Sequence, residues 1–166
     1  MYRTIEDFKK DWSYETGSTL KMFEKLTDES LSQKTYADGR DLGFIAWHIV
    51  VSLPEMAGKT GLTVPGPAED SDRPAEAKKI YEEFRTSAES VLKEVSEKWN
   101  DDDLLNTVNM YGEEWTKGYS LWVLIKHQTH HRGQMTVLMR QAGLKFPGVY
   151  GPSKEEWVNY GAPPAK

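Results

Sequence analysis

The stretch "LWVLIKHQTHHRGQMTVLMRQ", residues 121–141, decides the fold and holds three of the four histidines in the chain. Its apolar residues return at steps of three and four, which predicts an amphipathic helix with one face in a core. Successive helical residues turn by about 100°. His127 and His131 therefore point into the apolar face, whereas His130 lies off that face and is expected at an exposed rim.

The same helical periodicity recurs in three other segments. An amphipathic pattern covers about residues 3–27, and residues 41–61 are apolar nearly all round in their middle, which marks a buried helix. A third helix carries a single apolar stripe that ends at Trp99. The fourth is predicted to begin at Ser120, and Gly143 closes it as a C-terminal cap.

The connections between these helices are rich in turn-forming residues. A Pro- and Gly-rich loop precedes the third helix, which Ser71 or Asp72 is predicted to cap. Residues 104–116 indicate an irregular or short extended connection, and the aromatic residues 144–166 are expected to pack along the helices or a partner. Four helices without a convincing strand pattern predict an all-α four-helix bundle that forms a single domain over residues 1–166.

Composition narrows the classes of function. The net charge of -5 and a pI near 5.4 give no basic surface for nucleic acid or an anionic membrane. No run of roughly 18 apolar residues is present, and the N-terminus lacks a signal-peptide core, so we expect a cytoplasmic protein. The chain has no cysteine, which excludes thiolate ligands and a cysteine nucleophile. Any metal would be bound by imidazole and carboxylate.

Three histidines are candidate metal ligands. His127 and His131 form an H-x-x-x-H pair, a spacing that lets imidazoles on adjacent turns share one ion. His48, in the predicted buried helix, faces the same side as its apolar neighbours, and a bundle can place the two helix middles together. The alternative is that these are hydrogen-bonded core histidines, which is the usual role of a lone histidine on an apolar face.

Two further residues are weaker candidates for the chemistry. Glu55, two turns after His48, could act as a general base or a fourth ligand, and the alternative is a surface or supporting acid. Arg132 could bind an anionic substrate group, and the alternative is a structural ion pair. The zinc-protease motif H-E-x-x-H is excluded, because Gln128 follows His127.

These segments resemble those of a known family. Residues 121–143 are similar to the hallmark helix of the DinB/YfiT-like superfamily, which reads H-x-x-x-H-R-G-Q. The upstream "AWHIV" and the closing "FPGVYGPSKEEW" resemble further elements of that family, in the same order. The resemblance implies an up-down-down-up four-helix bundle, a homodimer, and a divalent ion, zinc or nickel, held by His48, His127 and His131.

The resemblance also implies an activity. Characterised relatives include S-transferases and isomerases that use low-molecular-weight thiols such as bacillithiol or mycothiol. We therefore expect a metal-dependent transferase that joins such a thiol to an electrophilic small molecule. Two alternatives stay open, namely a metal-dependent hydrolase and a non-enzymatic stress-response protein with a structural metal.

Overall fold

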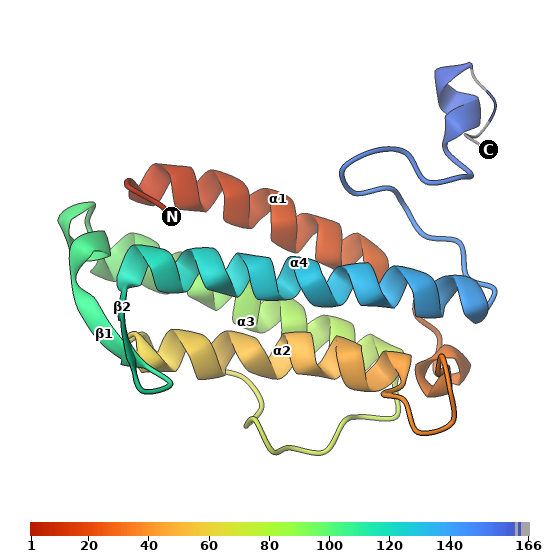
Figure 1. Cartoon of the computed structure of the whole chain (residues 1–166), viewed down its shortest axis with the longest axis horizontal. Helices are drawn as coiled ribbons and strands as arrows, with labels where there is room; N and C mark the ends of the chain where they lie inside the picture. Colours follow the sequence, from red (N-terminus) through yellow and green to blue (C-terminus); the bar gives the residue numbers. More distant parts are fainter. Residues whose placement is uncertain (162, 164–166) are drawn as a thin grey trace.

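A computed structural model describes residues 1–161 and 163 of the 166-residue chain. Over those residues it contains four α-helices, three short 3-10 turns and one β-hairpin (Figure 1). The 3-10 turns follow α1, precede the hairpin and lie near the C-terminus. The helices and strands are α1 (Ile5–Phe23), α2 (Leu42–Lys59), α3 (Ala77–Lys98), β1 (Thr107–Met110), β2 (Glu113–Thr116) and α4 (Lys117–Gln141).

The four helices lie side by side around one apolar core (Figure 1). Both α1 and α2 pack against α3 and against α4. Between α1 and α3, the rings of Phe23 and Phe84 meet edge to face with centroids 5.2 Å apart. The buried indole N–H of Trp12 donates to the carbonyl of Ala88 at 3.0 Å, so its polar tip is satisfied inside the core.

The second helix is the buried one, as its sequence predicts. Because α2 packs against both α3 and α4, side chains on different faces, such as Ile49 and Val50, are fully covered. Asp41 caps its N-terminus by accepting the backbone N–H of Phe44 at 2.6 Å. Despite this apolar helix, none of the helices described is long and apolar enough to cross a membrane.

The caps of α3 and α4 differ from those predicted. The third helix begins at Ala77, not after Ser71 or Asp72. The backbone N–H of Ala77 donates to the carboxylate of Asp28, on the segment after α1, at 2.7 Å. A cap supplied from a distant part of the chain leaves no local sequence signal. The fourth helix begins at Lys117, because Thr116 caps it three residues before Ser120. Its predicted closing residue is confirmed, since Gly143 has a left-handed φ of 75°.

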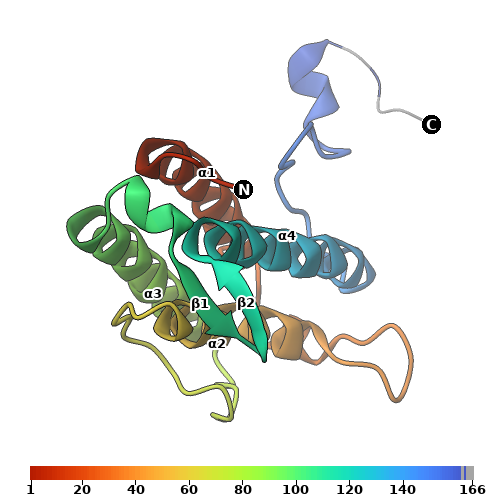
Figure 2. The same ribbon diagram turned by 60° about the vertical axis from the view of Figure 1, so that its left-hand side comes forward.

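The all-α prediction is right for the helices and misses a small antiparallel sheet. Residues predicted as irregular or extended form a hairpin in which Met110 pairs with Glu113. Tyr111 and Gly112 form the turn with φ of 57° and 90°, the two positive values that a type I′ turn requires. Figure 2 shows the hairpin beside the ends of α2 and α4, and it contacts both helices.

The segment after α4 is anchored to the helices at two places. The hydroxyl of Tyr150 donates to Glu15 of α1 at 2.7 Å, and Arg140 of α4 makes two hydrogen bonds with Glu155. Beyond these contacts the 3-10 turn Trp157–Tyr160 stands away from the four helices (Figure 1). The segment therefore packs along the helices in its first part only.

Candidate metal centre

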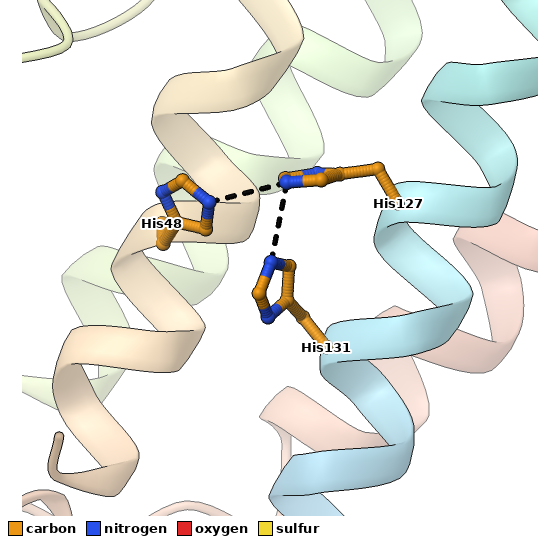
Figure 3. A group of neighbouring side chains, drawn as sticks. All are labelled: His48, His127 and His131. Carbon is orange, nitrogen blue, oxygen red and sulfur yellow. Dashed lines mark hydrogen bonds between the residues drawn. The ribbon is translucent and has the colours of Figure 1, made fainter. Parts of the chain in front are cut away.

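Three histidines meet where α2 and α4 lie against each other. His48 projects from α2, while His127 and His131 project from adjacent turns of α4 (Figure 3). The Nε2 atom of His127 lies 3.1 Å from that of His48 and 3.2 Å from that of His131. One ligand atom from each ring lies within 4.8 Å of the others. The three histidines predicted from helical geometry are therefore the ones that the fold brings together.

The spacing of these nitrogens fits a shared metal ion. With metal–nitrogen bonds of about 2.0–2.1 Å, two ligands in tetrahedral coordination lie roughly 3.3 Å apart. The Nε2 separations of 3.1 and 3.2 Å are close to that value. Three imidazoles also leave at least one coordination position for water or substrate, the arrangement typical of catalytic sites. The donor set therefore fits a divalent transition-metal ion.

The surroundings keep all three imidazoles in the form that binds a metal. Burial, together with the positive charges that His131 and His48 carry when protonated, lowers the pKa of His127 to about 4. Burial also lowers the pKa of His48 and of His131, and the nearby Arg40 adds to both effects. A metal binds neutral imidazole, so the ligands need not lose protons at neutral pH.

Gln134 orients one of the three rings. Its side-chain oxygen lies 2.7 Å from Nδ1 of His131, which therefore carries the proton and leaves a lone pair on Nε2. The amide nitrogen of Gln134 faces the Nε2 atom of His130. As predicted, His130 is exposed and lies outside the group of three histidines. Sequence reasoning did not assign Gln134 this role, although its position one turn after His131 was a usable signal.

Glu55 lies beside the histidines. It lines a cavity of about 240 Å³ together with His48, His127 and Tyr111. Its carboxylate accepts the hydroxyl of Tyr111 at 2.8 Å and pairs with Lys59 at 3.2 Å. Among the described residues the converging ligand atoms come from the three histidines, and Glu55 is outside that group.

Arg132 is directed away from the histidines, toward α1. Its side chain is 2% exposed, and Nη2 lies 2.5 Å from the carboxylate of Glu15. It also donates to the carbonyl of Glu15, to Thr19 and to Tyr150 at 2.9 to 3.1 Å. The structural ion pair is therefore the role observed, and both terminal nitrogens of the guanidinium are already hydrogen-bonded.

The fold and the site define a class of helical protein in which one histidine on α2 meets an H-x-x-x-H pair on α4. A model of the DinB family matches residues 1–164 of this sequence. The chain therefore belongs to the DinB family, as the resemblance of its helices indicated.

The chain is also similar to individual proteins along most of its length. The uncharacterized protein YrdA of Bacillus subtilis is 42% identical over 161 residues, which cover 97% of this chain and 96% of YrdA. The crystal structure of a DinB-like protein from Bacillus cereus is 46% identical, with a TM-score of 0.88 over 90% of this chain and 100% of that one. A crystal structure of a DinB-like protein from Bacillus subtilis shares the fold, with a TM-score of 0.68. It is 16% identical, and the match covers 86% of this chain and 96% of that one.

Proposed function

We propose that His48, His127 and His131 hold one divalent metal ion and that the protein transfers a low-molecular-weight thiol to an electrophilic small molecule. The observation that carries the proposal is the approach of three Nε2 atoms from two helices to 3.1 and 3.2 Å. Neutral imidazole suits zinc and nickel, the two ions proposed. Because the chain has no cysteine, the thiol would arrive as a cosubstrate.

The metal would supply a Lewis acid that stabilises a thiolate near neutral pH. In the proposed reaction the thiol gives its proton to Glu55, whose carboxylate lines the same cavity as His48 and His127. The thiolate sulfur then forms a bond to the electrophilic carbon, and the leaving group departs with its electron pair. Val51, Met56 and Val123 give this cavity an apolar wall that limits access of competing water.

We also propose the higher-level arrangement that the family resemblance implies. The segment between α2 and α3 runs back along the helices (Figure 1), which supports the up-down-down-up order in a single domain. A homodimer is supported by the protruding turn Trp157–Tyr160, where Val158 is 75% and Tyr160 is 70% exposed. Exposed apolar side chains of this kind favour association.

The proposed activity is tested by consumption of thiol. The zinc- or nickel-loaded protein is incubated with a small thiol and an alkyl halide, and loss of free thiol is followed beside the His127→Ala variant. His130→Ala is the matched control, because His130 lies outside the group of three. The proposal predicts metal-dependent thiol loss that His127→Ala abolishes and His130→Ala retains. Equal rates in all samples, or hydrolysis of the halide without thiol loss, would overturn it.

A further inference from the structure

The turn of the β-hairpin places Tyr111 at the cavity beside the histidines. Tyr111 lines this cavity together with His48, His127 and Glu55. The turn lies beside the C-terminal end of α2, the helix that carries Glu55 (Figure 1). The side chain of Tyr111 is 57% exposed, so it forms the part of the cavity wall that faces solvent.

Two polar contacts hold the Tyr111 ring against the end of α2. Its hydroxyl donates to Oε2 of Glu55 at 2.8 Å. The ammonium of Lys59 lies 5.0 Å from the ring centre, which is within the range of a cation–π contact. Both contacts lie at the surface, where the hydroxyl and the ammonium can bond to water instead. The ring can therefore leave this position without exposing a large apolar area.

The backbone of Tyr111 is strained. Its φ of 57° lies in the left-handed region, which is unfavourable for any residue with a large side chain. Met110 on one side is fully buried, and Gly112 on the other has a φ of 90°. Two strands of four residues also make a hairpin of low intrinsic stability. The tip can therefore change conformation while Met110 keeps the base of the hairpin in the core.

The observed position of Tyr111 also occupies the carboxylate of Glu55. Lys59 pairs with Oε1 at 3.2 Å, and the Tyr111 hydroxyl bonds to Oε2. Both oxygens of the carboxylate thus already accept a donor from the protein. In the proposed reaction this same carboxylate accepts the proton of the substrate. Departure of Tyr111 would free Oε2 for that proton at the moment when the cavity opens.

We propose that Tyr111 is the gate of the metal centre. In the closed state its hydroxyl is bonded to Glu55 and its ring covers the cavity. In the open state the ring turns toward solvent, and an ion or a substrate reaches His48 and His127 past the hairpin. The inference rests on the proposed function, because it takes the metal ion and the role of Glu55 from there. It adds the regulation of access to that site.

The test measures the rates of zinc uptake and release by the full chain, in stopped flow with a chromophoric chelator. A contact that is equally strong with and without the ion shifts no binding equilibrium, so a gate changes both rates by one factor and leaves the affinity unchanged. Tyr111→Phe keeps the ring and removes the hydrogen bond, whereas Tyr111→Gly removes the ring and suits the positive φ. Tyr14→Phe is the matched control, because its hydroxyl bonds to the carbonyl of Val149, away from the cavity.

We expect Tyr111→Phe to raise the rates of uptake and release about three- to tenfold, the effect of one lost hydrogen bond. Tyr111→Gly should raise them at least as much. The zinc affinity of both variants should stay within about twofold of wild type, because the hydrogen bond is made with or without the ion. Tyr14→Phe should exchange zinc at the wild-type rates.

A second route is tested with Phe44→Ala, because Phe44 and His48 line a neighbouring hollow of about 320 Å³. Faster exchange in Phe44→Ala, with wild-type rates in Tyr111→Gly, would assign access to that hollow and overturn the gate. Unchanged rates in Tyr111→Phe or Tyr111→Gly, with zinc still bound, would also overturn it and leave the proposed metal site standing. A change in affinity without faster uptake would show a structural contact instead of a gate. No zinc uptake by wild type would overturn both the gate and the proposed function.

Discussion

The guanidinium of Arg132 and the carboxylate of Glu15 form a buried ion pair across the α1–α4 interface, with Nη2 and Oε2 2.5 Å apart. Arg132 directly follows His131 in the sequence, yet the two side chains serve different interfaces. The helical turn of about 100° per residue sends one toward α2 and the other toward α1. The pair therefore fixes the rotation of α4 that directs His127 and His131 toward His48.

Arg132 and Glu15 should be strongly coupled in their contribution to the free energy of unfolding. Arg132→Met leaves the buried Glu15 carboxylate without its cationic partner, and we expect a loss of about 3–5 kcal/mol in the free energy of unfolding. The double variant Arg132→Met/Glu15→Gln should lose clearly less free energy of unfolding than the sum of the losses in the two single variants. Urea unfolding of the four proteins measures the coupling, and simple additivity would contradict the role assigned to the pair.

Two glycines of α4 should respond in opposite directions to alanine. A Cβ at Gly118 would lie 2.8 Å from the carbonyl oxygen of Tyr2 and 3.2 Å from that of Leu104, so Gly118→Ala should cost about 1–3 kcal/mol. A Cβ at Gly133 meets nothing within 4 Å, so Gly133→Ala should stabilise the helix by up to about 1 kcal/mol. Thermal unfolding measures the Tm of each variant, and a change of Tm in the same direction in both variants would contradict the packing described.

The anchor of the C-terminal segment should depend on pH. Two hydrogen bonds from Arg140, 2.6 and 2.7 Å long, lower the pKa of Glu155 to about 2. Because this pKa is lower in the folded state, the pair stabilises the anchor above the ordinary carboxyl pKa, and the effect is lost as pH falls toward 2. Carboxyl-carbon NMR should show that midpoint, and Arg140→Gln should return it toward the usual value of about 4.3. An identical midpoint in both proteins would refute the assignment.

Gln134 should act on metal affinity through His131. Gln134→Met keeps the length of the side chain but removes the acceptor for Nδ1–H, and loss of such a partner typically costs about 10–100-fold in affinity. Competition with a chromophoric chelator measures the zinc affinity. His130→Ala is the control, because Gln134 contacts His130 through its other atom. Equal affinity in wild type and Gln134→Met would show that the hydrogen bond has no part in binding.

Helical periodicity alone predicted the four helices and the faces of the histidines. The apolar stripe separated His127 and His131 from His130. In the structure the first two histidines converge with His48, and His130 is exposed. What the sequence could not reveal depends on contacts between distant segments. Asp28 caps α3 from 49 residues away, so the predicted start of that helix was too early. The role of Arg132 likewise depends on Glu15, which is 117 residues distant.

The hairpin escaped prediction for a different reason. Its strands are only four residues each, too short for alternation to stand out. Tyr111 at a positive φ is also an unusual turn residue, where glycine, asparagine or aspartate is common. The Tyr111 hydroxyl on Glu55 therefore had no recognisable signal in the sequence.

The central claim, a metal ion shared by α2 and α4, is tested most directly by the metal content of the purified, untagged protein. Elemental mass spectrometry would be applied to wild type, His48→Ala, His131→Ala and, as the matched control, His130→Ala, with circular dichroism to confirm folding. The account predicts about one zinc or nickel ion per chain in wild type and His130→Ala, and loss of that ion in both other variants while they stay folded. Absence of bound metal in wild type, even after loading with zinc or nickel, would contradict it.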